Sequence, residues 1–428
     1  MAHDWPLVPL GDLVDPTRGI SYGIVQPGEH VEDGVPIIRA GDLRGDRIDA
    51  GSPLRVSASI EANYSRTRLR GGELVMSIVG TVGQTAVINE QFIGWNTARA
   101  VAVIPVRPDI GAYWVRIALK TPAARERINS RLNTTVQATL NLKDVAELPI
   151  ALPPLAEREA ISSVLGALDE KIELNRRMNE TLEVTTRAIF KDWFVDFGPT
   201  RAKIEGHPPY LASDIWSLFP DRLDEAGTPA GWKSGTLGDL AEQVGESVKP
   251  EALSPETPYI GLEHMPRRSI ALTDWGGAGK VTSGKLAFKR GDFLFGKLRP
   301  YFHKVGIAPL DGICSTDIVV MNATQEAARA FVIACISQDE FVAFTDRTSD
   351  GTKMPRTSWG RMERYVLCVP DVPVLHAFNA IVQPMLNRII ANIHESRSLT
   401  VTRNLLLPKL MSGETRVRDP EENAGGAI

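Results

Sequence analysis

The sequence predicts a mixed α/β protein built from two copies of one plan, in which a globular unit is followed by a long helix. The segment that begins with Trp5 and ends with Gly11-Asp12-Leu13 returns as the segment that begins with Trp232 and ends with Gly238-Asp239-Leu240. Near the end of each copy, Pro153 and Pro370 stand 217 positions apart, and this spacing then holds without a gap through a helical stretch. A sequence repeat constrains the architecture of a protein more strongly than any single residue does. We therefore expect two similar globular units whose helices pack on each other as an antiparallel coiled coil.

Length and composition fit a cytoplasmic protein of several domains. The 428 residues are enough for two to four domains with real cores. No apolar run is long enough to cross a bilayer, and residues 1–5 lack the basic and apolar pattern of a signal peptide. The three cysteines, Cys314, Cys335 and Cys368, form no disulfide framework and suggest a reducing cytosol. The net charge of −4 argues mildly against nucleic acid as the sole partner, although locally clustered basic residues can outweigh it.

Each globular unit contains short β-like runs between turns that carry Gly and Pro. The first unit has such runs at 35–38, 73–79, 85–88 and 98–104, followed by a predicted helix over 113–132. The second unit has them at 259–262, 292–295, 306–308 and 318–321, followed by a predicted helix over 326–344. Residues 72–76 match 291–295, and Asn96-Thr97-Ala98 matches Ser315-Thr316-Asp317. The spacing between copies changes within the globular units, so we place the insertions in their loops.

The predicted helices carry a heptad seam, because apolar residues recur at alternating steps of four and three. The seam positions in the first copy are Ile161, Leu165, Leu168, Ile172, Asn175, Leu182, Ile189 and Trp193. Those in the second copy are Phe378, Val382, Met385, Ile389, Asn392, Leu399, Leu406 and Leu410. Polar residues such as Asn175 and Asn392 cost stability but fix the register. An ordinary core helix in each domain is the alternative, which a length of over thirty residues disfavours. Pro384 predicts a kink or an early break in the second helix.

These patterns divide the chain into six segments. They are a globular unit over 1–153, a helix over 154–197, an extended surface linker over 198–231, a second globular unit over 232–370, a second helix over 371–415 and a flexible tail over 416–428.

Several segments resemble the specificity subunit of type I restriction–modification enzymes. The resemblance rests on Leu152-Pro153-Pro154-Leu155-Ala156-Glu157-Arg158, on Lys191-Asp192-Trp193-Phe194-Val195-Asp196-Phe197-Gly198-Pro199, and on Leu407-Pro408-Lys409-Leu410-Met411-Ser412-Gly413-Glu414. It also includes Asp169-Glu170-Lys171-Ile172 and Ile215-Trp216-Ser217-Leu218-Phe219-Pro220. It covers nearly the whole chain, and its helical motifs are more specific than its globular ones. Arg158 departs from the family, which usually has Gln there, and the second copy lacks this Gln too, with Pro373-Val374-Leu375-His376.

The resemblance implies two target recognition domains, each of which reads half of a split sequence in double-stranded DNA. It further implies that the two helices form a coiled-coil spacer and dock two modification subunits. Those partners would methylate adenine with S-adenosylmethionine, and restriction motor–nuclease subunits, using ATP and Mg²⁺, would cleave unmodified DNA. The chain itself would be a non-catalytic recognition subunit that binds no cofactor and no metal.

Near matches to catalytic motifs support a non-catalytic chain. His207-Pro208-Pro209-Tyr210 is similar to an amino-methyltransferase motif, but its first residue is wrong and no glycine-rich cofactor loop precedes it. The stretch from Gly279 to Leu286 nearly spells a P-loop, but Leu286 replaces the hydroxyl that would hold magnesium. His394-Glu395 lacks the second histidine of a zinc site. A self-contained methyltransferase is therefore the weakest alternative.

Basic residues gather around glycine loops at matching places in both units, which favours DNA contact. Lys and Arg on phosphates supply affinity, whereas Arg, Asn and Gln on base edges supply specificity. Taken singly, each of these basic residues is explained equally well as ordinary solvent-exposed surface. The loops 133–139 and 350–357 are the preferred base-reading candidates. The predicted DNA-binding residues are Arg39, Arg68, Arg99, Gln137, Thr139, Lys143, Lys285, Lys297, Arg299, Lys304, Lys353, Arg356 and Thr357.

Two other functions remain open at this point. The chain could be the specificity subunit of a related defence system with different effector subunits. It could also be a structural coiled-coil adaptor, which would show no sequence-dependent DNA binding.

Overall fold

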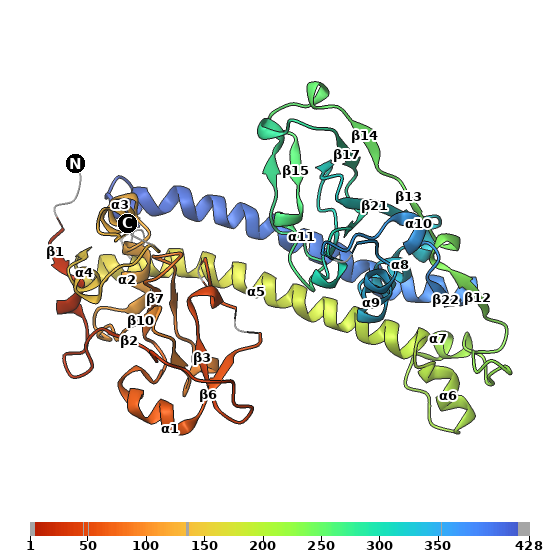
Figure 1. The fold of residues 1–428 in the computed structure, drawn as a ribbon, viewed down its shortest axis with the longest axis horizontal. Helices are drawn as coiled ribbons and strands as arrows, with labels where there is room; N and C mark the ends of the chain where they lie inside the picture. The colour runs from red at the N-terminus through yellow and green to blue at the C-terminus, as the bar shows by residue number, and fades with distance from the viewer. Residues whose placement is uncertain (1–4, 46, 50, 134–136, 352, 418–428) are drawn as a thin grey trace, which may run out of the picture. The chain divides into compact units, whose positions relative to one another are not determined.

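The computed structural model describes residues 5–45, 47–49, 51–133, 137–351 and 353–417. The chain forms two compact units (Figure 1). Unit 1 comprises Met1–Asp169 with Thr400–Ile428, and unit 2 comprises Glu170–Leu399. Among the described residues, no helix is long and apolar enough to cross a membrane.

Unit 1 is built on a four-stranded antiparallel sheet in the order β2-β10-β7-β8. Its core includes Leu74 and Met76 of the sheet and the fully buried Trp114 of the covering helix α2. The strands of unit 1 are β1 (Leu7–Pro9), β2 (Ser21–Tyr22), β3 (Val35–Ile38), β4 (Leu43–Arg44), β5 (Arg47–Ile48), β6 (Leu54–Val56), β7 (Leu74–Ser77), β8 (Thr85–Val87), β9 (Asn96–Thr97), β10 (Val101–Ile104) and β11 (Pro149–Ala151). Its short helices are α1 (Ala58–Glu61), α2 (Ala112–Ala118), α3 (Pro122–Ser130) and α4 (Leu142–Ala146).

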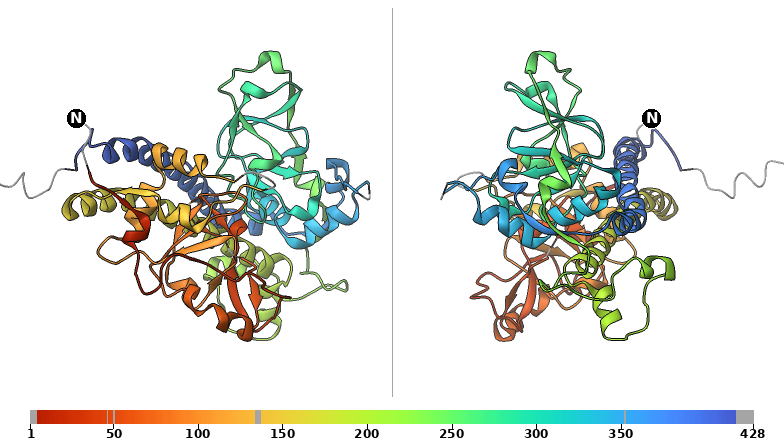
Figure 2. Two further views of the ribbon diagram at one scale, coloured as in Figure 1. Left: turned by 60° about the vertical axis from the view of Figure 1, so that its left-hand side comes forward. Right: turned by 90° about the vertical axis from the view of Figure 1, so that its right-hand side faces the viewer.

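Unit 2 repeats this plan with a four-stranded sheet in the order β13-β21-β18-β19. Its second sheet, β14-β17-β20-β15-β16, has five strands where the second sheet of unit 1, β6-β3-β9, has three, and Figure 2 shows it in green to cyan. The two sheets correspond, because β15 pairs in parallel with β20 as β3 does with β9. The strands are β12 (Lys233–Thr236), β13 (Ala241–Gln243), β14 (Glu246–Val248), β15 (Pro258–Ile260), β16 (Gly276–Gly277), β17 (Lys285–Phe288), β18 (Phe293–Gly296), β19 (Val305–Ile307), β20 (Gly312–Cys314), β21 (Ile318–Ala323) and β22 (Val366–Val369). The short helices are α6 (Gly198–Ile204), α7 (Ser213–Ser217), α8 (Arg329–Ile336), α9 (Asp339–Arg347) and α10 (Trp359–Met362).

The single helix predicted after the strands of each unit is in fact two helices. In unit 1 the chain breaks between α2 and α3, where the side chain of Thr121 accepts a hydrogen bond from the amide of Ala124 and Pro122 opens the new helix. Such an N-cap followed by proline starts a helix and cannot continue one. In unit 2 the break falls between α8 and α9 at Gln338. The prediction of one continuous helix was wrong at equivalent places in both copies.

The segment 198–231 is also more ordered than the extended linker that was predicted. It contains α6 and α7, and Phe219 is buried with its ring 5.0 Å from that of Trp193. The ammonium group of Lys203 donates a hydrogen bond to the carbonyl group of Phe219, 2.5 Å away. Buried aromatic residues therefore fold this connector onto the end of the preceding helix.

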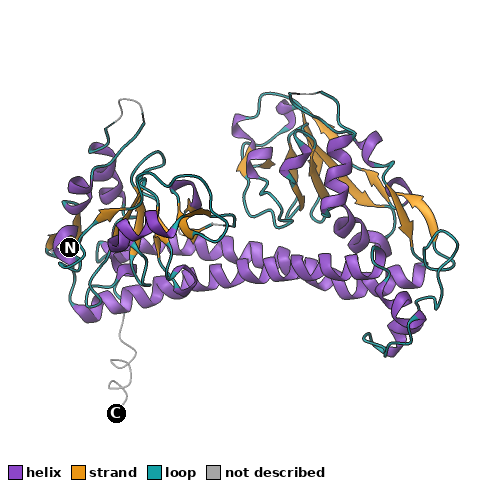
Figure 3. Cartoon of the chain, turned by 60° about the horizontal axis from the view of Figure 1, so that its bottom comes forward, coloured by secondary structure: helices purple, strands orange, loops and turns teal. Residues whose placement is uncertain are grey.

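The two long helices are α5 (Leu155–Phe194) and α11 (Val372–Met411), and Figure 3 shows them lying side by side. The predicted early break at Pro384 does not occur, because α11 continues through it. Pro384 is exposed, so water can bind the carbonyl group that the proline leaves without a donor. None of the sixteen predicted seam residues is exposed.

Polar side chains of the seam in unit 2 bond across the helix pair. The side-chain amide of Asn392 donates to that of Asn179 at 2.8 Å. The amide of Asn175 donates to Glu395 at 2.9 Å and to Ser396 at 3.3 Å. From Asn175 to Asn179 the contacts advance by four residues along α5, whereas their partners on α11 go back by four residues, from Ser396 to Asn392. The antiparallel pairing predicted from the sequence is confirmed.

The part of the helix pair that belongs to unit 1 holds a largely buried charge cluster. The carboxylate of Asp169 accepts hydrogen bonds from Tyr113 at 2.9 Å, from Arg403 at 2.6 Å and from Arg116. Burial, followed by the charge of Asp169, raises the pKa of Tyr113. The equivalent positions in unit 2, 217 residues away, are neutral: Leu386, Thr186, Ile333 and Ala330.

Candidate nucleic-acid interface

Two loops of unit 2 are joined by backbone bonds at the end of β18, and we call residues 297–299 with 353–357 the unit 2 clasp. The amide of Thr357 donates to the carbonyl group of Lys297 at 3.1 Å, and the amide of Arg299 donates to that of Pro355 at 2.7 Å. Arg356 forms β-bridges with Leu298 and with Asp350. The loop that carries the predicted base-reading residues is therefore fixed to the central sheet.

Unit 1 has the same construction, and we call residues 78–80 with 137–140 the unit 1 clasp. The amide of Leu140 donates to Ile78, and the amide of Gly80 donates to Ala138, both at 2.9 Å. Thr139 forms β-bridges with Val79 and with Asn133. Each of these contacts corresponds to one in the unit 2 clasp. Residues 134–136 of the predicted base-reading loop, and residue 352 of its counterpart, lie outside the described residues.

Both clasps need a left-handed backbone at the same position. Gly80 has a φ of 81° and Arg299 has a φ of 51°. Glycine adopts this conformation without steric cost, whereas arginine pays for the contact between its Cβ and the backbone. Strained residues of this kind concentrate at functional sites, where the surrounding structure holds them in place.

The side chains on the two clasps differ in charge. In unit 2 the guanidinium group of Arg356 lies 2.6 Å from the carboxylate of Asp317, and Lys353 is exposed. Lys297 is half-buried, and this burial lowers its pKa.

In unit 1 Thr139 replaces Arg356, and the hydroxyl group of Thr139 donates to the carbonyl group of Gln137 at 3.1 Å. The exposed amide of Gln137 lies beside Gly80, where an added Cβ would be 3.2 Å from its nitrogen.

Of the four other residues predicted to bind DNA in unit 2, Lys285 and Lys304 are occupied by hydrogen bonds within the unit. The ammonium group of Lys285 is buried and donates to the carbonyl group of Ser283 at 3.0 Å and to its hydroxyl group at 2.8 Å. Lys304 donates to the carbonyl group of Leu262, and burial lowers the pKa of Lys304. Arg299 and Thr357 each have one buried polar side-chain atom without a partner among the described residues. Lys285 also begins strand β17 where a P-loop would open a helix.

The remaining residues of unit 1 that were predicted to bind DNA differ in their exposure and in whether they form ion pairs. Arg39 forms an ion pair with Asp42 at 3.1 Å, and Arg68 forms one with Glu61. Arg99 is exposed and directly precedes Ala100, whose carbonyl group accepts from the amide of Ile78 in the clasp. Lys143 is 87% exposed and lies 3.9 Å from Glu147. The structure therefore brings Arg99, Gln137 and Thr139 to the clasp and leaves Arg39 and Arg68 paired elsewhere.

Asp317 is the residue that sequence reasoning missed. The match of Asn96-Thr97-Ala98 with Ser315-Thr316-Asp317 was wrong by two residues. The amides of Val101 and Ile318 donate to the carbonyl groups of Ala98 and Ser315 respectively, so Ala98 and Ser315 are equivalent. Asp317 therefore corresponds to Ala100. The spacing of 217 residues already seen between Pro153 and Pro370 gives this match directly.

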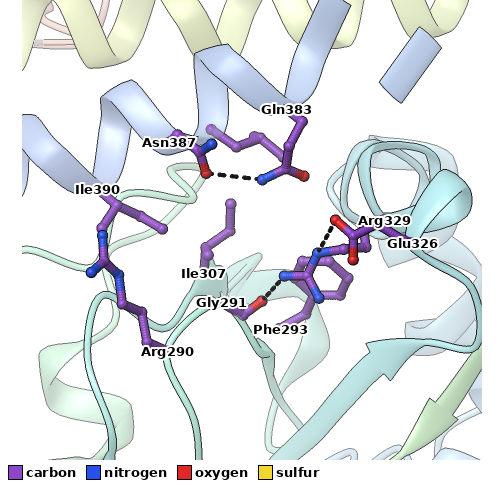
Figure 4. Close-up of a pocket in the computed structure, with 10 residues that line it drawn as sticks. Arg290, Gly291, Phe293, Ile307, Glu326, Arg329, Gln383, Asn387 and Ile390 are labelled. Carbon is purple, nitrogen blue, oxygen red and sulfur yellow. Dashed lines mark hydrogen bonds and ion pairs between the residues drawn. The ribbon is translucent and has the colours of Figure 1, made fainter. Parts of the chain in front are cut away.

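A separate cavity of about 630 Å³ lies in unit 2 between α11 and the four-stranded sheet (Figure 4). The guanidinium group of Arg329 donates to the carbonyl group of Gly291 at 2.8 Å and lies 3.8 Å from Glu326. Gln383 donates to Asn387 at 3.0 Å across the helix surface. None of the predicted DNA-binding residues lines this cavity, so it is distinct from the clasp.

Comparison with known proteins agrees with the predicted resemblance. Residues 3–184 match the family model of the type I restriction modification DNA specificity domain. The EcoBI type I restriction enzyme specificity subunit of Escherichia coli is 31% identical over 160 residues, which are 37% of this chain and 34% of that protein. The MjaIX specificity subunit of Methanocaldococcus jannaschii is 25% identical over 288 residues, which are 64% of this chain and 62% of that protein. The matches thus span about a third of the first relative and less than two thirds of the second.

A solved structure has a similar fold. The S subunit of the type I restriction–modification system from M. genitalium superposes with a TM-score of 0.55 at 16% identity, covering 95% of this chain and 96% of that chain. At this identity the likeness concerns the fold alone. The predicted resemblance to type I specificity subunits is confirmed, as is the mixed α/β fold with repeated units and paired helices.

Proposed function

We propose that this chain, which resembles type I specificity subunits, is the non-catalytic subunit that recognises double-stranded DNA in a restriction–modification complex. The observation that carries the proposal is the pair of clasps, which share their backbone bonds but display different side chains. Base edges in the major groove are distinguished by the donors and acceptors presented to them. Two such frames with different donors suit a bipartite target whose two half-sites differ.

The partners that we propose are two modification subunits, which methylate adenine with S-adenosylmethionine, and motor–nuclease subunits that use ATP and Mg²⁺. Two equivalent residues on the helices support equal docking sites. Val184 of α5 and Val401 of α11 are 217 positions apart, and both are exposed, by 59% and 53% respectively. Repeated surfaces recruit equal partners. Exposed apolar side chains at the same place in each copy are suited to being covered by one modification subunit each.

We further propose that the length of α5 and α11 sets the unread gap between the half-sites. Each helix has 40 residues and contributes to both units. Seven residues added after Asp169 and seven after Leu399 would keep the heptad and lengthen the pair by about 10 Å. At ~3.4 Å per base pair, the gap should grow by about three base pairs while both half-sites stay the same. An unchanged gap in the methylated sequence would reject this spacer role.

The proposed function is tested by methylome sequencing of cells that express the full chain with a modification subunit from the same organism. We expect methylated adenines in two short motifs separated by a fixed gap, and no such methylation without this chain. Sequence-dependent DNA binding without methylation would favour a related defence system. A structural coiled-coil adaptor, the other alternative, would bind DNA without regard to sequence or would not bind it at all.

A further inference from the structure

We propose that Arg356 and Asp317 together determine specificity in unit 2 by selecting a guanine–cytosine base pair in its half-site. This inference rests on the proposed function, because it requires the unit 2 clasp to face DNA. Arg356 would contact the guanine, and Asp317 would hold the guanidinium group in place and accept from a cytosine amino group.

The geometry fixes the backbone of both residues while leaving the pair open to solvent. The amide of Arg356 donates to the carbonyl group of Asp350 at 2.9 Å, and the carbonyl group of Asp317 accepts from the amide of Lys297 at 2.7 Å. The amide of Asp317 also donates to the hydroxyl group of Ser315 at 3.2 Å. The side chain of Arg356 remains 54% exposed and that of Asp317 30% exposed.

The chemistry of the pair matches one base pair in particular. A guanidinium group has five N–H donors in a planar fork, so the ion pair with Asp317, which involves one terminal nitrogen, leaves donors free. Two donors on one edge of this fork fit the O6 and N7 acceptors of guanine, and a carboxylate accepts from the amino group of cytosine. An arginine that is already held loses less freedom on binding than a mobile one.

The fold of the clasp does not require the pair. Thr139 and Ala100 occupy the equivalent positions in unit 1 and keep the same backbone contacts without any charge. An ion pair this exposed also contributes little to stability. The pair is therefore a feature of the surface that unit 2 presents, which unit 1 lacks.

The main test is Asp317→Asn in the full chain, measured by selection from a library of randomised DNA duplexes. The amide keeps the size of the carboxylate but removes its charge. We expect the preference for guanine at one position of one half-site to fall by about 5- to 150-fold, with the other half-site unchanged. Equal weakening for all sequences, or an unchanged guanine preference, would overturn the proposal. Thermal unfolding of the variant shows that any effect does not come from loss of the fold.

The reciprocal test moves the pair into unit 1 with Ala100→Asp and Thr139→Arg together. A new guanine preference in the other half-site would support the proposal, and Thr139→Arg alone should give a weaker preference because its arginine is not held. A folded double variant with the original sequence preference would count against it. If the natural chain selects no sequence at all, the proposed function itself fails. If it selects a sequence that Asp317→Asn leaves intact, only the present inference fails.

Discussion

Units 1 and 2 keep the same backbone bonds in their clasps but differ in charge both at the clasp and beside the helices. Arg356 of unit 2 is paired with Asp317, whereas its equivalent Thr139 is neutral. Beside the helices the difference is reversed, because Asp169 of unit 1 gathers charged partners and its equivalent Leu386 is apolar. The comparison shows that backbone hydrogen bonds maintain the frame of each copy, which leaves its side chains free to diverge.

The largest expected effect comes from exchanging a whole unit. Replacing residues 1–150 with the equivalent unit of a relative should change one half-site completely and leave the other unchanged, because each clasp is held by bonds within its own unit. Methylome sequencing of cells with the hybrid chain measures both half-sites at once. The matched control exchanges residues 232–370 and should change the other half-site. A hybrid that altered both halves would show that the units do not read DNA independently.

The next largest effect should come from the largely buried charge cluster of unit 1. Asp169→Leu removes the carboxylate that accepts hydrogen bonds from Tyr113, Arg116 and Arg403, and we expect a loss of roughly 3–5 kcal/mol in the free energy of unfolding. Replacing the set with apolar or small residues, as in unit 2, should recover most of this loss. That variant combines Asp169→Leu, Arg116→Ile, Arg403→Thr and Tyr113→Ala, which are the residues that unit 2 has at the equivalent positions. Chemical denaturation measures both variants, and a set variant no more stable than Asp169→Leu would contradict this account of the two units.

The sequence predicted the repeat and the helix seam because these depend on periodic patterns. Hydrophobic spacing along α5 and α11 is visible without knowledge of tertiary contacts, and so are strands such as β3 and β7. The breaks before α3 and α9 were missed, because Thr121 and Gln338 lie inside otherwise helical stretches. A local sequence signal was present only at Thr121-Pro122.

The candidate site was only partly predictable, for a physical reason. The sequence placed Arg356 and Gln137 in matching loops, but a run of basic residues does not reveal which side chains are already paired. Lys285 is buried against Ser283, and Asp317 meets Arg356 from a position 39 residues away in the chain. Such contacts depend on the register of neighbouring strands, which a two-residue error in the match of the copies had obscured.

A smaller effect should distinguish the docking surfaces of the two helices. Val184→Asp and Val401→Asp each place a charge in a proposed apolar contact, which should weaken one modification subunit by about 2 kcal/mol or more. Mass measurement of the reconstituted complex should then show one modification subunit per chain for either variant and two for the natural chain. Thr181→Asp, an exposed change on α5 outside these positions, serves as the control. Full occupancy in both valine variants would place docking elsewhere.

The smallest expected effect concerns the left-handed residue at the turn of each clasp. Arg299→Gly should raise the free energy of unfolding by about 1 kcal/mol, because glycine adopts the φ of 51° without strain. The same change removes one positive charge from the unit 2 clasp, so binding should weaken for all DNA sequences together, with a slightly smaller salt dependence.

Gly80→Ala is the matched change in unit 1 and should destabilise the protein, because a side chain is strained at its φ of 81°. Chemical denaturation and binding at several salt concentrations separate the two effects. An Arg299→Gly chain that is less stable would mean that contacts of the guanidinium group, such as the one 5.8 Å from the ring of Phe302, outweigh the backbone strain.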